Sequence, residues 1–433
     1  MNKILKILLI FIFFSSCSLN KNSKFWSNEK IIKENKKNTE EIFKKEKTLD
    51  LEFNQNTKIS LYSKTIENSF INNYDNNNGR VNFFGTIENK SKFKYAKIDR
   101  FFEYNPEINF EKKNIIFFDN KGSILKFDEN SKLIWKKNYY SKPEKKHKPI
   151  LFFANNNNKL IVADNISKFY ALDVTTGEML WSKNNIAPFN SQIKIYKDHF
   201  FIIDFNNTLN AYSISNGDKL WSVKTDKTLV RSQQKLSMVI INEKIIFNNS
   251  IGDITAVDIN SGQMIWQTPT QSSLIYDDSF FLKTSVIVAD KNTIYLSNNK
   301  GFFFSLDLNT GLLNWKHNIQ STLRPTIIDN YIFTVSDNGY LFILDKISGN
   351  IVRITDIFKN IKIKKRKTTK PTGFIVASKN IYLTTNNGRL LLINIETGRT
   401  VSTLKIDKQK ILRPMVLNKS LFIATENSII KLN

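Results

Sequence analysis

The chain has 433 residues, a formal net charge of +25 and a single cysteine. One cysteine excludes a disulfide within the chain, so the fold has to be held together by packing. The charge alone is compatible with binding to nucleic acid or to an anionic membrane. Lys and Asn are abundant together with Ile and Phe, whereas Ala and Gly are scarce. Because AT-rich coding DNA gives this bias, a basic, solvated surface is the favoured interpretation.

The N-terminus has the organisation of an export signal. A basic start, Met1–Lys6, is followed by the apolar run Ile7–Phe14 and by Ser15-Ser16-Cys17. The apolar run is far shorter than the roughly 20 residues that cross a bilayer as a helix. We therefore expect residues 1–16 to be a lipoprotein signal peptide, which also argues against a nucleic-acid partner.

Cys17 is the expected site of lipidation. The run Phe14-Ser15-Ser16-Cys17 resembles a bacterial lipobox, with Phe14 in place of the usual Leu. The resemblance implies a diacylglycerol on the thiol and an acylated amino terminus, and several acyl chains anchor a protein firmly. Ser18 is not acidic, which in similar bacteria favours sorting to the outer membrane. We expect an anchor on the periplasmic face of that membrane.

Residues 17–80 form the expected tether between the lipid and the folded body. This segment is rich in Lys, Asn, Glu and Ser and lacks sustained apolar periodicity. Such a composition is typical of disorder. We predict a mostly disordered tether, with a short helix near residues 40–47, followed by a folded domain over residues 81–433.

The folded domain is built from repeats. Tyr170–Trp181 and Ala256–Trp266 follow one template, in which an Asp precedes a tight turn with Gly, and a Trp follows. The turn glycines recur 38 to 49 residues apart, a period typical of propellers or repeat arrays. These glycines are Gly177, Gly217, Gly262, Gly311, Gly349 and Gly398.

Each repeat predicts four strands. Two short runs rich in Val, Ile, Leu and Tyr flank Asn-Ser-Gly or Asn-Thr-Gly, which indicates a β-hairpin whose Gly supplies a positive φ. Another strand pair precedes each hairpin, as in Ile332–Leu344. Four antiparallel strands make one blade of a β-propeller.

The last repeat lacks its outer strand, because the chain stops after Ile429–Asn433. We predict that an N-terminal strand at Lys94–Ile98 completes it, since a closed ring leaves no open sheet edge. The sequence then predicts an all-β fold, an eight-bladed β-propeller of four-stranded antiparallel blades. The equivalent outer-strand positions are Tyr95, Trp135, Trp181, Trp221, Trp266, Trp315, Arg353 and Ser402.

The recurring Trp and Asp residues have structural explanations. A large ring at one place in every blade packs most simply between adjacent sheets, and its loss at Arg353 and Ser402 predicts looser interfaces there. The Asp residues recur once per repeat, as expected of side chains that bind the amides of their own turn. They are Asp173, Asp258, Asp307 and Asp345.

The template of Ala-Leu-Asp, three residues, Gly, three residues and Trp resembles the repeat of pyrroloquinoline-quinone-type propellers. Together with the lipoprotein signal, the blade number and the C-terminus Leu412–Asn433, it resembles the BamB family of outer-membrane assembly lipoproteins. The resemblance implies a non-enzymatic scaffold that binds the periplasmic POTRA domains of BamA. It also implies a role in delivering unfolded outer-membrane proteins.

The resemblance implies that two loops of this chain form a partner-binding site. In the family, a loop with a short apolar segment and an Arg meets BamA, together with acidic residues of the next loop. Thr228–Ser232 matches the first loop, with Leu229 and Val230 as apolar neighbours of Arg231, against the alternative of a solvated Arg. The next loop offers Asp277 and Asp278, although its length and spacing differ from the family pattern.

The alternative function is a quinone-dependent dehydrogenase. Such an enzyme needs a calcium site, a general-base Asp and, in many members, a vicinal disulfide. The chain cannot form a disulfide, and His147, His199 and His317 lack metal-ligand spacing. We therefore expect no cofactor, no metal and no catalytic residues.

One more loop is strongly basic. Lys359–Lys370 contains seven Lys and Arg residues, which could meet lipid headgroups or an acidic partner. Composition bias explains much of this cluster as well.

Overall fold

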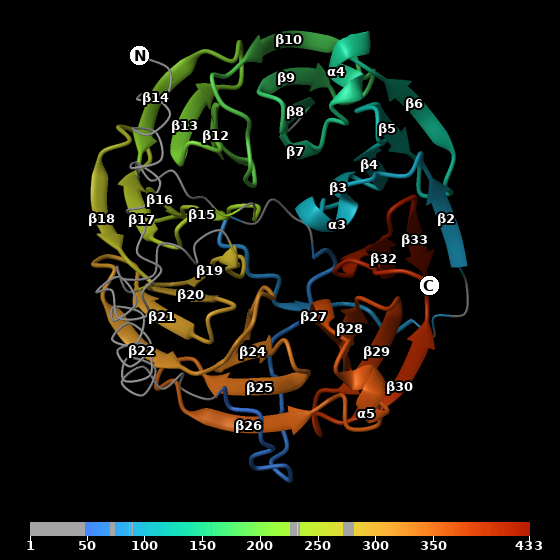
Figure 1. The fold of residues 1–433 in the computed structure, drawn as a ribbon, viewed down its shortest axis with the longest axis vertical. Helices are drawn as coiled ribbons and strands as arrows, with labels where there is room; N and C mark the ends of the chain where they lie inside the picture. The colour runs from blue at the N-terminus through green and yellow to red at the C-terminus, as the bar shows by residue number, and fades with distance from the viewer. Residues whose placement is uncertain are drawn as a thin grey trace, which may run out of the picture. The chain divides into compact units, whose positions relative to one another are not determined.

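The repeats form a ring of four-stranded antiparallel sheets in a computed structural model of the chain. The structure describes residues 48–69, 74–85, 87, 90–156, 158–225, 232, 234–271 and 281–433. Within these residues the strands make eight sheets, arranged around a common centre (Figure 1). The prediction of an all-β, eight-bladed propeller is confirmed.

Each blade runs from an inner strand at the centre to an outer strand at the rim (Figure 1). The inner strands are β3 (Asn109–Glu111), β7 (Leu151–Asn156), β11 (Lys194–Tyr196), β15 (Met238–Ile241), β19 (Val288–Asp290), β23 (Thr326–Ile328), β27 (Pro371–Ala377) and β31 (Met415–Leu417). The second strands are β4 (Asn114–Phe118), β8 (Lys159–Asp164), β12 (His199–Ile203), β16 (Lys244–Asn248), β20 (Thr293–Ser297), β24 (Tyr331–Val335), β28 (Asn380–Thr385) and β32 (Ser420–Ala424).

The two remaining strands of each blade form the hairpin recognised in the sequence. The third strands are β5 (Ile124–Phe127), β9 (Lys168–Asp173), β13 (Thr208–Ser213), β17 (Ile254–Asp258), β21 (Phe303–Asp307), β25 (Tyr340–Asp345), β29 (Arg389–Asn394) and β33 (Ser428–Leu432). The outer strands are β6 (Leu133–Lys137), β10 (Met179–Asn184), β14 (Lys219–Lys224), β18 (Met264–Thr268), β22 (Leu313–His317), β26 (Ile351–Asp356), β30 (Thr400–Lys405) and β2 (Lys90–Lys94).

Burial follows the position of a strand in its blade. In β16, Ile245, Ile246 and Phe247 are all fully buried, because the middle strands meet neighbouring blades on both faces. The outer strand β10 instead alternates half-buried and exposed side chains, since one of its faces is open to solvent. Continuous apolar runs therefore mark the middle strands, and alternating runs mark the rim.

The hairpin turns explain the repeated Asp and Gly residues. In the fourth blade, Asp258 Oδ1 accepts hydrogen bonds from the amides of Asn260 at 3.0 Å and Ser261 at 2.7 Å. Gly262 follows with a φ of +73°, a conformation that glycine adopts without strain. The turn-stabilising role predicted for Asp258 is confirmed.

The tryptophans pack between blades, as predicted. A Cβ atom on Gly262 would lie 2.6 Å from Cε3 of Trp221 in the preceding blade, so the ring rests directly on the glycine turn. Trp181 fixes the same arrangement one blade earlier, because its Nε1 donates to the Ile214 carbonyl at 3.0 Å. Each turn thus shapes its own hairpin and also packs against the Trp side chain of the preceding blade.

The expectation of a loose interface at Arg353 is wrong. Arg353 is fully buried and packs against the turn at Gly398. Its Nη2 donates to the Ile395 carbonyl in the next blade at 2.9 Å. Ile395 is equivalent to Ile214, whose carbonyl accepts the hydrogen bond from Trp181. Nη1 of Arg353 also donates to the carbonyls of Thr57 at 2.8 Å and Glu396 at 2.5 Å. The guanidinium therefore replaces the indole and binds three carbonyls in its place.

The next interface, where Ser402 occupies the Trp position, is filled from elsewhere in the chain. Val81 and Phe83 are buried in the apolar cluster that joins β28 to β32. The Phe83 ring lies 5.0 Å from that of Tyr382, edge to face. The N-terminal segment thus supplies apolar surface to the interface between the seventh and eighth blades.

An N-terminal strand closes the ring, but four residues earlier than predicted. β2 pairs with β33, with Ser91 opposite Lys431 and Phe93 opposite Ile429. Lys431 matches Ala171, the partner of Trp181, so Ser91 stands at the outer-strand position that we had assigned to Tyr95. Tyr95 instead lies past the strand, where its hydroxyl donates to the Thr425 carbonyl at 2.5 Å. A solvent-facing rim strand lacks the motif that would have fixed its register.

The folded body begins earlier than the predicted boundary near residue 80. Thr48–Asn433 form one compact unit, and the amide of Ile59 donates to the Glu396 carbonyl at 3.1 Å. Phe53 and Ile354 exchange two backbone hydrogen bonds. Farther on, β1 (Arg80–Val81) runs parallel to β27 and adds a fifth strand to the seventh blade. The predicted tether before residue 48 lies outside the described residues.

Short helices occur in connections between strands. They are α3 (Phe101–Tyr104), α4 (Lys142–Lys146) and α5 (Ile363–Arg366). In the described ranges we find no helix with the length and apolar character needed to cross a membrane.

We predict that Phe93 is essential for closure. Its buried ring lies 5.8 Å from that of Phe127 in the first blade and 6.1 Å from that of Phe422 in the last. Phe93→Ala should lower the free energy of unfolding by about 3–5 kcal/mol, because a cavity forms at the joint. Urea unfolding measures this loss, with exposed Lys92→Ala as the matched control. Equal stability of the two variants would show that the joint does not limit stability.

A second prediction concerns Arg353. Arg353→Met should reduce stability by roughly 3 kcal/mol, since it leaves buried carbonyls without donors. Arg353→Trp should lose less, because an indole at this position reaches the same carbonyl in other blades. Thermal unfolding ranks the three proteins, and a Met variant as stable as the unsubstituted chain would contradict the proposed role of the guanidinium.

Candidate functional site

The residues predicted to meet a partner lie outside the described residues. This holds for Leu229, Val230 and Arg231 in one loop, for Asp277 and Asp278 in the next, and for the lipidation site Cys17. The structure does describe the chain on either side of the two loops. The first loop joins β14 to β15, and the second joins β18 to β19.

The flanks of these two loops are hydrogen-bonded to each other. Ser232 Oγ donates to the Leu282 carbonyl at 2.6 Å. The Thr284 amide donates to Gln234 Oε1 at 2.5 Å, and Gln234 Nε2 donates in return to the Thr284 carbonyl. The bases of the two predicted partner loops are therefore neighbours, although about fifty residues separate them in sequence.

Every connection from an outer strand to the next inner strand leaves from the same end of the ring, because the blades repeat one strand order. We call this end the loop end. Besides the two predicted loops, the basic segment 359–370 lies there, between β26 and β27. Within it, Arg366 pairs with Asp356 at 2.6 Å and Lys359 pairs with Glu52 at 3.2 Å.

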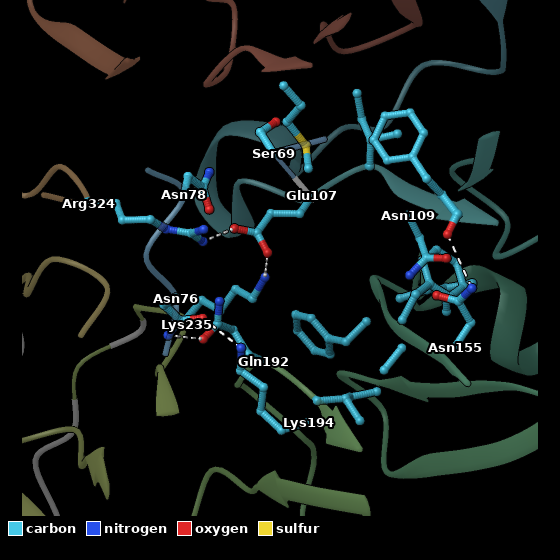
Figure 2. A pocket seen from close by; sticks show the side chains of 18 residues that line it. Ser69, Asn76, Asn78, Glu107, Asn109, Asn155, Gln192, Lys194, Lys235 and Arg324 are labelled. Carbon is cyan, nitrogen blue, oxygen red and sulfur yellow. Dashed lines mark hydrogen bonds and ion pairs between the residues drawn. The ribbon is translucent and has the colours of Figure 1, made fainter. Parts of the chain in front are cut away.

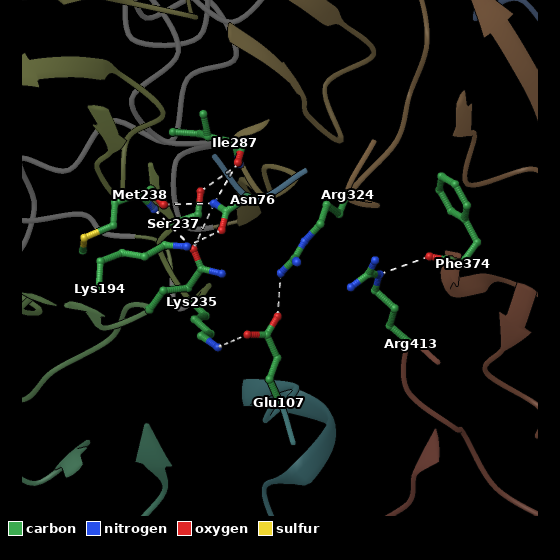
Figure 3. A network of polar contacts seen from close by, with 11 residues as sticks. Asn76, Glu107, Lys194, Lys235, Ser237, Met238, Ile287, Arg324, Phe374 and Arg413 are labelled. Carbon is green, nitrogen blue, oxygen red and sulfur yellow. Dashed lines mark hydrogen bonds and ion pairs between the residues drawn. The ribbon is translucent and has the colours of Figure 1, made fainter. Parts of the chain in front are cut away.

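A charged cluster lies where the inner strands begin. Glu107 precedes β3, and its Oε1 lies 2.7 Å from Nη2 of Arg324, which precedes β23. Its other oxygen, Oε2, lies 3.4 Å from Nζ of Lys235, which precedes β15. Figure 2 shows these side chains converging from different blades on one space. Arg413, before β31, points toward the same carboxylate from a fourth blade (Figure 3). We call Glu107, Lys235, Arg324 and Arg413 the channel cluster.

A segment near the N-terminus crosses the channel beside this cluster. Asn76 is buried, and its Nδ2 donates to the carbonyls of Met238 and Ile287, each at 2.9 Å (Figure 3). Its Oδ1 accepts a hydrogen bond of 2.6 Å from Nζ of Lys194. The next residue, Asn77, donates to the Ile327 carbonyl at 3.0 Å. Two adjacent amide side chains thus link the inner strands of the fourth, fifth and sixth blades.

The channel cluster lines two cavities that share several walls. One has a volume of about 340 Å³ and is lined by Asn76, Glu107, Lys194, Lys235 and Arg324 among others. The other, of about 170 Å³, adds Arg413. The Glu107 side chain keeps 43% of its surface accessible, so solvent in the channel reaches the cluster.

Positive charge dominates the electrostatics of the cluster. Desolvation within the channel would raise the pKa of Glu107, but Lys235, Arg324 and Arg413 together hold it well below its ordinary value. Burial and the repulsion of Arg324 lower the pKa of Lys194 to about 7. The same two causes lower the pKa of Arg413 to about 9. The Glu107 carboxylate therefore faces several cationic side chains, and these cations repel one another.

Among the described residues, no group of three or more His, Cys, Asp or Glu side chains could hold a metal ion. Two of the three histidines have structural partners: His317 Nε2 lies 2.6 Å from the Gly349 carbonyl, and His199 packs edge to face with Phe201. His147 ends α4.

Our sequence reasoning missed the channel cluster, although a signal was present. Leu323-Arg324-Pro325 and Leu412-Arg413-Pro414 repeat the same tripeptide before an inner strand. Glu107 and Gln192 occupy the equivalent position, seven residues before the second strand of their blades. Alignment of the blades on their inner strands, in addition to their hairpins, would have shown polar residues at one level of the channel.

The fold and the repeats define the class of the protein: an eight-bladed propeller of quinone-type repeats. Among solved structures, BamB from Moraxella catarrhalis matches with a TM-score of 0.63 at 15% identity, covering 79% of this chain and 100% of that one. A quinohemoprotein alcohol dehydrogenase from Comamonas testosteroni also has a TM-score of 0.63, at 11% identity, covering 85% and 81%. At these identities the likeness shows the fold alone.

Sequence comparison distinguishes BamB proteins from quinohemoprotein dehydrogenases as relatives of this chain. Residues 120–355, more than half of the chain, match the family described as outer membrane protein assembly factor BamB. A BamB of Moranella endobia is 24% identical over 277 residues, which cover 62% of this chain and 68% of the relative. The chain belongs to the BamB family, as its repeats had indicated.

Proposed function

We propose that this chain is a non-enzymatic scaffold for the assembly of outer-membrane proteins. It binds the POTRA domains of BamA, joins the rest of the barrel assembly complex, and aids the insertion of unfolded β-barrel proteins. Family membership carries this proposal, because the matching relatives are named as assembly factors of the outer membrane.

The arrangement of the loop end supports a partner site there. The bases of loops 226–231 and 272–280 are joined by hydrogen bonds between Ser232 and Leu282 and between Gln234 and Thr284. Two loops held at a common base can present side chains to one partner at the same time. In our proposal Arg231 is the centre of that contact, Leu229 and Val230 exclude water from it, and Asp277 and Asp278 lie at its edge.

Chemistry inside the channel is not part of the proposed function. The one carboxylate of the channel cluster is paired with Lys235 and Arg324, so it is poorly suited to accept a proton as a general base. The recurring Asp residues are engaged in their own turns, as Asp258 is with Asn260 and Ser261. These engagements favour a scaffold over a quinone-dependent dehydrogenase.

We also propose that Cys17 carries the lipid that holds the protein on the periplasmic face of the outer membrane. Residues 18–47 would then act as the spacer between the membrane and the folded body. This assignment rests on the lipobox-like run and on the single cysteine.

The partner site is tested by charge reversal. Arg231→Glu should abolish capture of BamA from solubilised envelopes, because truncation alone of such an Arg typically costs about 2 kcal/mol or more. Circular dichroism and the melting temperature should stay unchanged, since the sequence places Arg231 in a connection between β14 and β15.

The control is the double reversal Lys364→Glu and Lys365→Glu in the basic segment. Both residues are exposed, and this variant should capture BamA normally. If instead the double variant loses BamA while Arg231→Glu retains it, the basic segment is the contact and the proposed loops are not.

Lipidation is tested at Cys17. Cys17→Ser should remove incorporation of a labelled fatty acid and release the protein from the membrane fraction, because no other thiol exists in the chain. Ser18→Ala is the matched control and should remain labelled. Persisting label on the Cys17 variant would refute the anchor.

A further inference from the structure

The channel cluster has more positive charge than its own acid neutralises. Glu107 is shared between Lys235 and Arg324. Arg413 has no acidic partner among the described residues: its Nε donates to the Phe374 carbonyl at 3.1 Å, and its Nη2 has no hydrogen-bond partner there. Nε of Arg324 likewise has no hydrogen-bond partner within the described part of the chain.

Two guanidinium groups face each other in this cluster. Figure 3 shows Arg324 and Arg413 entering from opposite sides, with their terminal nitrogens directed into the space above Glu107. Each disfavours the charge of the other, and the repulsion of Arg324 contributes to the lowered pKa of Arg413. An added anion between them would relieve that repulsion.

The space between these groups is large enough for such an anion. The cavity lined by Lys235, Arg324 and Arg413 measures about 170 Å³ and shares walls with the one of about 340 Å³. A single water needs roughly 10–15 Å³ of such volume, so a group of several heavy atoms fits. Gln192 and Gln234 also line the smaller cavity, and the amide group of Gln234 is already bonded to Thr284.

We propose that the channel cluster is a binding site for a small oxyanion, a phosphate or a dicarboxylate, held between Arg324 and Arg413 with Lys235 as a third cation. Guanidinium groups bind carboxylate and phosphate oxygens through paired hydrogen bonds, which favours these ligands over halides. Glu107 limits the affinity, because it occupies one face of Arg324 and repels an incoming anion. The site adjoins the base of the loops proposed to contact BamA, since Gln234 and Thr284 also line its cavity.

Calorimetric titration of the full chain tests the site. Inorganic phosphate is added in one arm and succinate in the other, with ionic strength held constant by sodium chloride. We expect saturable binding of one anion per chain and a higher melting temperature in its presence. Whichever anion binds more tightly identifies the ligand class. Failure of both to bind would overturn the proposal.

Substitutions locate the site. Arg413→Gln should weaken binding at least tenfold, because it removes one of the two guanidinium groups. Its anion-free melting temperature is measured alongside, since the variant loses a like-charge contact and also the hydrogen bond to the Phe374 carbonyl. Lys365→Gln, an exposed lysine of α5, should bind as the unsubstituted chain does. Equal affinity in Arg413→Gln, or an equal loss in Lys365→Gln, would show that the anion binds elsewhere.

Glu107→Gln gives a readout that a purely structural ion-pair cluster would not. Removing the competing carboxylate should tighten anion binding severalfold, even if the anion-free protein melts at a lower temperature. Weaker binding in this variant would overturn the proposal. Should Glu107→Gln fail to fold, Glu107→Ala provides the same test, because it also removes the carboxylate.

Discussion

The antiparallel pairing of β2 with β33 is the contact on which the rest of the ring depends. Each of the other seven blades is continuous in sequence through its four main strands, whereas the eighth is assembled from both ends of the folded body. Without β2, the edge of β33 would be open, and the interface between the last blade and the first would lose Phe93. A closed ring also fixes where the inner strands begin. The channel cluster exists because four of those beginnings meet at one level.

The interfaces between blades depend on the turn glycine of each hairpin, which shapes its own blade and also contacts the preceding one. The glycine that permits the hairpin turn also leaves room for the ring of the preceding blade, as Gly262 does for Trp221. Neighbouring blades are therefore matched by the same residues that shape each blade. Arg353 shows that this arrangement accepts different chemistry, provided that the side chain is large. Arg353 donates to the carbonyl at the foot of the next hairpin, as Trp181 and Trp266 do, whereas Nε1 of Trp135, Trp221 and Trp315 has no partner among the described residues.

Most of the architecture could be predicted from sequence, because the information in each blade is local. The alternation of strands, the Asp and Gly of the turns and their spacing give the fold and the number of blades. The register of β2 could not be predicted, since its one buried residue, Phe93, is flanked by exposed lysines and carries no template. The role of Arg353 was also missed, because a degraded motif does not reveal that a guanidinium can replace an indole.

The candidate sites were harder to predict, for a different reason. Glu107, Lys235, Arg324 and Arg413 come from four blades, and only the closed ring brings them together. The order of residues 48–69 was missed because their contacts are backbone hydrogen bonds to blades far along the chain, such as that of Ile59 with Glu396. Such contacts do not require apolar periodicity.

The path of the chain before β2 has a mechanical consequence. Leu49 donates to the Asn318 carbonyl, Phe53 is paired with Ile354, and Ile59 is bonded to Glu396. Tension applied to the chain ahead of Thr48 therefore enters the ring at the fifth, sixth and seventh blades, and these bonds bear it first. The joint between β2 and β33 lies beyond them along the chain, with β1 in between. A molecule held by its N-terminus can thus be pulled and displaced by its surroundings while the strand that closes the ring stays unloaded.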